Sequence, residues 1–205
     1  MISRSKLFAL FVIALIGAGC DSGSSTSPRP LPPISPPPPL AGLSTGPSSC
    51  IGGMAGDFAC SGLALRKRVS NDEMGGGDGN DIWGWADAQT GNEYALMGLS
   101  NGTAFIDVTD PENPVFLGHL ATNTVEAAWR DIKVYLDHAF VVTDGAGAHG
   151  MQVFDLTRLR NVTTPETFTA DANYSDFGRA HNIAINEATG FAYAVGTNTC
   201  SGGLH

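Results

Sequence analysis

Basic residues are scarce in this 205-residue chain, which has 11 Lys and Arg against 20 Asp and Glu and a net charge of −9. If residues 1–19 are removed as an export signal, Arg4 and Lys6 are lost and the net charge becomes −11. A chain this acidic is repelled by the phosphates of nucleic acids and by anionic lipids. The charge balance therefore argues against either of these as its main partner.

Several motifs that carry chemistry are missing as well. The histidines and cysteines form no close pair of the H-x-x-x-H or C-x-x-C type, which is the spacing of many metal sites. Neither of the glycine-rich stretches, GGGDG and GAGAHG, is followed by the helix that a phosphate-binding loop requires. The sequence places no serine or cysteine beside a histidine, so nucleophilic catalysis has little support. A non-enzymatic function is favoured.

No apolar run is long enough to cross a membrane, which takes about 20 residues. The run Leu7–Ile16 follows Arg4 and Lys6 and leads through small residues to Cys20, as in an export signal. The stretch LIGAGC resembles the lipobox of bacterial lipoproteins, in which the signal is cleaved before the cysteine and lipid is attached to its thiol. The resemblance implies a signal peptide over 1–19 and lipid on Cys20. The alternative is a secretory signal cut at another small residue.

Aromatic residues are absent from 20–49, which is rich in Ser, Pro, Gly and Thr and contains SPRPLPPISPPPPL. This composition favours polyproline II and cannot bury a core. We expect a tether that holds the following domain away from the membrane. The protein is thus predicted to be exported, anchored in the bacterial cell envelope by lipid on Cys20, and to face the periplasm or the exterior.

Cysteines are few in the remainder, which has Cys50, Cys60 and Cys200. In an exported protein disulfides persist, and the short loop from Cys50 to Cys60 is one that a bridge closes readily. We predict a disulfide between these two residues, which leaves Cys200 without a partner in this chain. The alternative is that all three are small buried residues.

Helical periodicity is missing from 50–205, where short β-branched and aromatic runs lie between turn residues. Three segments align, at 81–129, 130–180 and 181–205. Trp83, Ile132 and Ile183 are 49 and 51 residues apart, and the glycines that open a third strand in each segment, at 102, 150 and 203, are 48 and 53 apart. A period of about 50 residues is typical of β-propeller blades. The sequence predicts an all-β fold, a β-propeller with an incomplete set of about three blades.

Turn residues support these repeats. DAQTGNEY and NEATGFAY each place a glycine before an aromatic-led strand, as hairpins that need positive φ do. Asp107 and Asp155 occupy the same place at the ends of strands in two repeats. We expect their carboxylates to accept backbone N–H groups of the next turn.

The pattern GTAFIDVTDPENPVFLG resembles the LVIVD repeat of bacterial and archaeal surface β-propellers. Together with WRDIKVYLDHAFVV, HGMQVFDLTRLR and AHNIAINEATGFAYAVG, it makes 50–205 similar to the choice-of-anchor B family of exported proteins. The resemblance implies a propeller that members hold to the cell in different ways, here by lipid. It implies no catalytic residues. It also implies further blades after His205, so we expect this chain to be a fragment with exposed apolar blade faces.

Candidate metal ligands are spread along the repeats. Imidazole and carboxylate suit zinc or another divalent ion, and a propeller channel can gather distant residues, here Asp131, His149, His181 and His205. The alternative is that these histidines bond loop backbones, and His119 and His138 are expected in turns. A second candidate is a calcium loop with Asp72, Asp78, Asn80 and Asp81, against the reading of an acidic surface loop.

Two functions follow. The first is a cell-envelope lipoprotein whose β-propeller is a binding or scaffolding module for a protein or glycan and needs no cofactor. The second is an exported metal-dependent hydrolase with its site at the mouth of the propeller channel.

Overall fold

The computed structural model describes residues 43–205. Its strands form mainly antiparallel sheets, and none of these closes on itself within this range. The helices of the described residues are the short 3₁₀ turns η1 (Asp72–Met74), η2 (Leu156–Asn161) and η3 (Cys200–Gly202). β-Branched and aromatic residues form strands here because their side chains pack well on a pleated surface. The predicted all-β class is confirmed.

The first sheet is a four-stranded antiparallel meander with a fifth strand at its far edge. The meander consists of β3 (Gly79–Ala86), β4 (Glu93–Leu99), β5 (Gly102–Asp107) and β6 (Val115–Ala121). β10 (Glu166–Phe168) comes from much later in the chain and pairs parallel to β6. The second predicted repeat, 130–180, thus gives one strand to the sheet of the first repeat, which the alignment of the repeats does not anticipate.

A second sheet and a hairpin follow. The second sheet consists of β7 (Trp129–Tyr135), β8 (His138–Asp144), β9 (Met151–Asp155) and β11 (Ala172–Tyr174), which are neighbours in that order. β12 (Asn182–Asn186) pairs with β13 (Phe191–Val195) in the hairpin. The first strands β3, β7 and β12 begin within two residues of the predicted repeat starts.

The predicted third strand forms in the first two repeats and does not form in the last one. β5 begins at Gly102 and β9 at Met151, next to Gly150, as expected. The strand expected at Gly203 does not form, because the chain first turns through η3. Only His205 pairs with the hairpin, through two backbone hydrogen bonds with Ala194, of 2.8 and 3.1 Å.

The register of this pair nevertheless agrees with the repeats. His205 lies opposite Ala194. At the equivalent place Gln152 lies opposite Val141 in the second sheet, and Ala104 opposite Met97 in the first.

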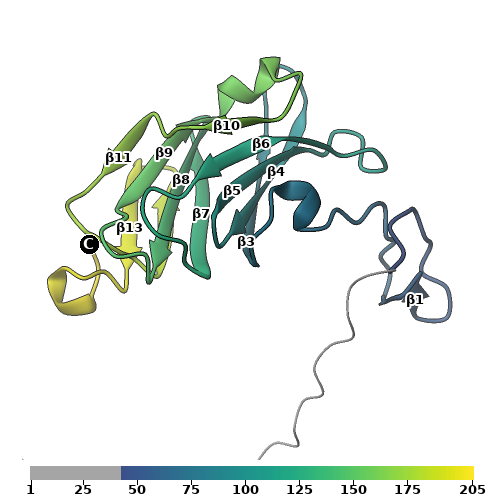
Figure 1. The fold of residues 1–205 in the computed structure, drawn as a ribbon, viewed down its shortest axis with the longest axis horizontal. Helices are drawn as coiled ribbons and strands as arrows, with labels where there is room; N and C mark the ends of the chain where they lie inside the picture. The colour runs from purple at the N-terminus through teal and green to yellow at the C-terminus, as the bar shows by residue number, and fades with distance from the viewer. Residues whose placement is uncertain (1–42) are drawn as a thin grey trace, which may run out of the picture. The chain divides into compact units, whose positions relative to one another are not determined.

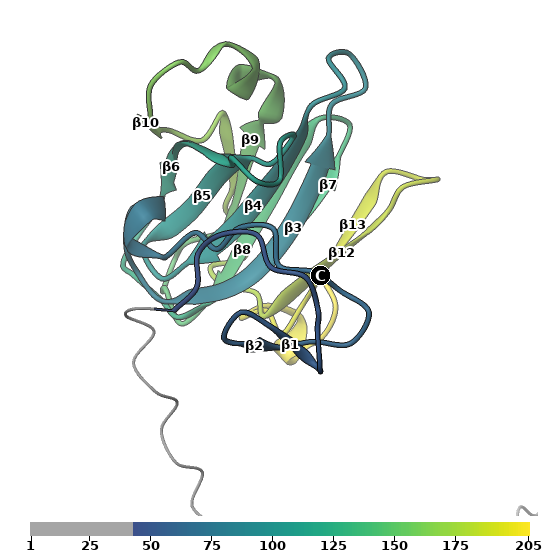
Figure 2. The same ribbon diagram turned by 90° about the vertical axis from the view of Figure 1, so that its right-hand side faces the viewer.

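The sheets pack face to face, with the second sheet between the first sheet and the hairpin (Figures 1 and 2). The larger core lies between the first and second sheets and contains Phe105, Phe154 and Phe168. A smaller core between the second sheet and the hairpin contains Val142, Phe177, Ala180, Ile183 and Ala194. Because the sheets stack in sequence, the strands β3, β7 and β12 lie side by side at one edge. We call this the inner edge.

The predicted turn chemistry is confirmed. Gly91 and Gly190 have φ of 79° and 73°, which only glycine adopts freely. Asp107 accepts the backbone N–H of Thr109, and Asp155 accepts that of Thr157, each at 2.9 Å.

The amino-terminal part of the described chain is closed by a disulfide between Cys50 and Cys60, the pairing that the sequence predicts. Within it the two-residue strands β1 (Met54–Ala55) and β2 (Phe58–Ala59) form a small hairpin. Backbone hydrogen bonds already join Ser48 to Leu65 and Thr45 to Arg68. Paired chain therefore begins a few residues before the predicted end of the tether at 49.

Cys20 and the signal peptide predicted for 1–19 lie outside the described residues. Cys200 is exposed and free, so it is not a buried residue. No helix within 43–205 is long and apolar enough to span a membrane.

Candidate functional site

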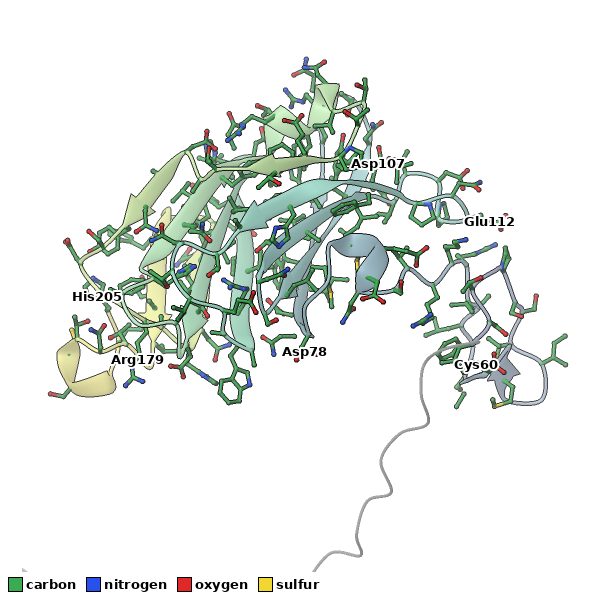
Figure 3. All side chains as sticks on the ribbon, viewed as in Figure 1. Cys60, Asp78, Asp107, Glu112, Arg179 and His205 are labelled. Carbon is green, nitrogen blue, oxygen red and sulfur yellow. A yellow bond between two sulfur atoms is a disulfide. The ribbon has the colours of Figure 1, made fainter. Side chains whose placement is uncertain are left out.

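A polar pocket of about 170 Å³ lies at the inner edge, where β3, β7 and β12 begin. It is lined by one dipeptide from each repeat and by one indole, namely Asn80-Asp81, Arg130-Asp131, His181-Asn182 and Trp129. Figure 3 shows Asp78, just before β3, and Arg179, just before β12, on the same side of the molecule. We call this cavity the inner pocket.

The inner pocket is held together by a repeated hydrogen bond between successive sheets. The Asp81 carboxylate accepts the backbone N–H of Ile132 at 2.8 Å, and the Asp131 carboxylate accepts that of Ile183 at 2.6 Å. Asn80 Oδ1 also accepts the Arg130 N–H, at 2.8 Å. β3, β7 and β12 are edge strands, whose outward backbone groups need such partners when they are buried. β3 therefore holds β7 in place, and β7 holds β12 in place.

The two carboxylates have different surroundings. Desolvation is the main cause that raises the pKa of Asp81 above its usual range, and the charge of Asp131 raises it further. The second Asp131 oxygen receives the Lys133 ammonium group, which also lies 4.3 Å from the centre of the Trp83 ring. Asp131 is thus neutralised within the fold, whereas Asp81 keeps one oxygen that can accept a further hydrogen bond.

Arg130 lines the inner pocket and contacts His149, which is buried behind it. Arg130 donates to the carbonyl oxygens of Leu99 and Ser100, and its Nη1 lies 3.4 Å from His149 Nε2. Burial lowers the pKa of Arg130 to about 10. Burial also lowers the pKa of His149, with a further lowering by the charge of Arg130. Since His149 Nδ1 lies 3.0 Å from the Gly150 carbonyl oxygen, we assign a neutral imidazole with its proton on Nδ1 and Nε2 facing Arg130.

The four predicted metal ligands are not all brought together. Asp131 and His181 both line the inner pocket. His149 lies behind it, and His205 lines a different cavity, of about 200 Å³, between the second sheet and the hairpin. There the ring nitrogens of His205 lie 2.9 Å from the Tyr174 and Thr199 hydroxyl groups. Between residues 43 and 205, no group of three or more His, Cys, Asp or Glu side chains is arranged to hold a metal ion.

The other histidines and the acidic loop have structural surroundings. His119 lies inside β6, with Nε2 3.3 Å from Asn101 Oδ1, so its predicted place in a turn is wrong. His138 begins β8 next to a turn. Of the proposed calcium ligands, Asp72 lies in η1, and Asn80 and Asp81 belong to the bonds between sheets.

One motif that the sequence contains has no counterpart in the predictions. GLSNG at 98–102 fits the G-x-S-x-G pattern of serine hydrolases. That pattern needs a strand-to-helix turn, whereas here it connects β4 and β5 in a hairpin. The Ser100 hydroxyl accepts the Asp78 N–H at 3.1 Å. Ser100 therefore stabilises the entry into β3.

The sequence did not predict that Trp129 and Asn182 line this pocket. It also did not predict that Asn80 and Asp81 bind the backbone of the next sheet. A signal for them exists in the sequence, because N-D-I, R-D-I and H-N-I recur at 80–82, 130–132 and 181–183. The residues before each isoleucine thus occupy the same place in each sheet.

No protein-family model, curated protein or solved structure matches this chain. The similarity to the choice-of-anchor B family therefore stays a prediction.

Proposed function

We propose that this protein is a lipid-anchored component of a bacterial cell envelope, with a propeller-type module that binds a ligand at the inner pocket. The observation that carries the proposal is the repeated bond between sheets, from Asp81 to Ile132 and from Asp131 to Ile183. Equivalent bonds between successive sheets are what stacked propeller blades would make, and they support a propeller arrangement. The propeller architecture and its similarity to surface proteins with LVIVD repeats are part of this proposal.

Export is supported by the disulfide between Cys50 and Cys60, since such bonds persist in oxidising compartments. Lipid on Cys20 accounts for a membrane attachment that leaves the domain outside. The Pro-rich 20–49 segment supplies the distance between the lipid and the sheets.

Binding is favoured over catalysis by the partners that the charged groups of the inner pocket already have. Asp131 is held by Lys133 and the Ile183 N–H, and His181 Nδ1 lies 3.1 Å from an Asp144 oxygen. Groups fixed in this way orient a ligand without changing their own state. The alternative, a metal-dependent hydrolase, requires Asp131 to exchange the Lys133 ammonium group for a metal ion, whereas His181 could keep Asp144 and use Nε2.

Two measurements on the full chain in its host test the proposal. A clickable fatty acid should label the unaltered chain and not the Cys20→Ser variant, and equal labelling of both contradicts the lipid anchor. For the pocket, a photo-crosslinking amino acid replaces Trp129, or Glu187 at the exposed β12–β13 turn as the matched control. We expect adducts of defined mass from position 129 only. Equal yields from both positions, or none from 129, contradict binding at the inner pocket.

A further inference from the structure

Trp129 is unusually exposed for an indole at the start of a core strand. It keeps 57% of its surface accessible, whereas Arg130 and Asp131, which follow it in β7, are 3% and 5% exposed. An exposed aromatic ring beside fixed polar groups is a common feature of binding sites, because it supplies a large contact area with little loss of conformational entropy.

The backbone that carries this ring is fixed by its neighbours. Trp129 lies directly opposite Asp144 in the β7–β8 pair, and its carbonyl oxygen accepts the Thr143 hydroxyl. Asp144 in turn contacts His181, with 3.1 Å between Asp144 Oδ2 and Nδ1, and Arg179 at 3.5 Å. The indole therefore stands next to an imidazole whose orientation a carboxylate sets.

Around the ring the inner pocket presents both donors and acceptors. The Asn80 Oδ1 and Asp81 Oδ2 atoms are used within the fold, which leaves the Asn80 amide N–H₂ as a donor and Asp81 Oδ1 as an acceptor. His181 Nε2 and the exposed Asn182 amide complete the set.

The charges at the inner pocket disfavour an anionic ligand. Arg130 lines the pocket but its buried guanidinium donates to the Leu99 and Ser100 carbonyl oxygens. Lys133 is bound to Asp131, and Arg179 is bound to Asp144. Each cation near the pocket is thus matched by an acid or enclosed by the fold. Nucleic acids and acidic sugars are repelled by this arrangement.

We propose that the inner pocket binds one ring of a neutral glycan, with the apolar C–H face of the sugar on the Trp129 indole. The hydroxyl groups at the ring edge, which both donate and accept, would pair with Asn80, Asp81, His181 and Asn182. A cavity of about 170 Å³ suits one sugar ring better than a folded protein surface. This inference rests on the proposed binding function and names the ligand class for the same site.

The test uses the full chain carrying Cys20→Ser, so that lipid is not required. Cellohexaose, maltohexaose and chitohexaose are the neutral probes, and pentagalacturonate is the acidic one, each titrated by isothermal calorimetry. We expect saturable binding of at least one neutral probe and none of pentagalacturonate. The Trp129→Ala variant should bind that probe at least tenfold more weakly, whereas Tyr193→Ala, which alters an exposed aromatic ring of the hairpin outside the inner pocket, should bind within twofold of the parent.

Circular dichroism and a thermal melt establish that both variants keep the fold. The inference is overturned if no neutral probe binds, if Trp129→Ala binds as well as the parent, or if pentagalacturonate binds more tightly than the neutral probes. Crosslinking from position 129 in cells together with no oligosaccharide binding would refute the glycan and leave the binding module. Oligosaccharide binding together with no fatty-acid labelling of the unaltered chain in its host would refute only the anchor.

Discussion

The molecule has two junctions, one between the first and second sheets and one between the second sheet and the hairpin. Each contains an equivalent hydrogen bond to an aspartate, but the side chains that fill them differ. In the first, Asp81 holds Ile132, and in the second, Asp131 holds Ile183. The first encloses a cluster of three buried phenylalanines, whereas the second encloses one buried phenylalanine, Phe177, with Phe140 only partly buried beside it. The repeat motif therefore fixes the spacing of the sheets and leaves the volume of the core to residues outside it.

The exchange of one strand explains much of this difference. β10 brings Phe168 over the first junction, where its ring centre lies 5.7 Å from that of Phe105 and 5.1 Å from that of Phe154. The hairpin receives no such strand, and Phe191, Tyr193 and Val195 on its outer face are 64%, 37% and 39% exposed. An apolar face of this kind is stable when a neighbour covers it.

The largest effect expected is from Phe154→Ala in the first junction. Loss of a buried phenylalanine removes its transfer free energy and leaves a cavity, which together cost about 3 to 5 kcal/mol. Phe177→Ala in the second junction should cost less, because its ring contacts only Tyr174 and His205 among aromatic groups. Urea unfolding of both variants measures the two free energies. Equal losses would show that the junctions are energetically alike and end the comparison.

Loss of the disulfide should destabilise the amino-terminal part of the described chain and leave both junctions unchanged. Replacing Cys50 and Cys60 by serine removes the constraint on a short loop, a loss of about 2 to 3 kcal/mol on the loop-entropy model. We expect faster amide hydrogen exchange over 44–68, because the backbone hydrogen bonds of this segment join its own residues. Amides of β5 and β8 serve as the internal control. Faster exchange in those strands too would mean that the bridged segment supports the sheets.

Sequence periodicity was sufficient for the first strands and the turns and insufficient for long-range pairing. The repeats marked Ile132 and Ile183 correctly, and both are buried, each in its own core. In the first sheet the predicted equivalent, Trp83, is wrong by one residue, because Ile82 follows Asp81 as Ile132 follows Asp131, and Ile82 is 61% exposed. β10 could not be found in this way, since a three-residue strand has too few side chains to show alternation. The ion pair of Asp87 with Arg160, at 2.7 and 2.8 Å, joins residues 73 apart in the chain, a contact that no local pattern reports.

The candidate site was predictable to the same extent. The repeats placed Asp131 and His181 near one another, because both precede or begin first strands. They gave no reason to separate His149 and His205 from that pair, since burial behind Arg130 and contact with Tyr174 depend on the packing of whole sheets. Trp129 was missed because exposure at the end of a strand has no signature in the sequence.

The two equivalent aspartates give a sharper test of the junctions. Asp131→Ala leaves the Ile183 N–H and the Lys133 ammonium group without their partner, and an unpaired buried N–H costs about 1 to 3 kcal/mol. Asp81→Ala should cost less at neutral pH, because desolvation, which raises the pKa of Asp81, already disfavours its charged form in the folded chain. Chemical unfolding at pH 7 compares them. A larger loss for Asp81→Ala contradicts this account of the two carboxylates.

The smallest expected effect is a loss of folding stability at acid pH, and it arises at the first junction. Burial, followed by the charge of Arg130, lowers the pKa of His149 below its usual value, and the same two causes lower that of His119. The unfolded chain therefore binds these protons more readily. The stability that the neutral imidazoles contribute is present above about pH 6.5 and is lost as the pH falls toward the folded pKa.

We expect the urea midpoint of the parent to fall between pH 7.5 and 5.0. It should fall less in the His149→Gln variant, whose amide oxygen can still accept a hydrogen bond from Arg130. His138→Gln, at the start of β8, is the matched control and should fall as far as the parent. If His149→Gln also falls that far, proton uptake at this buried imidazole does not weaken the first junction, and its acid sensitivity has another source.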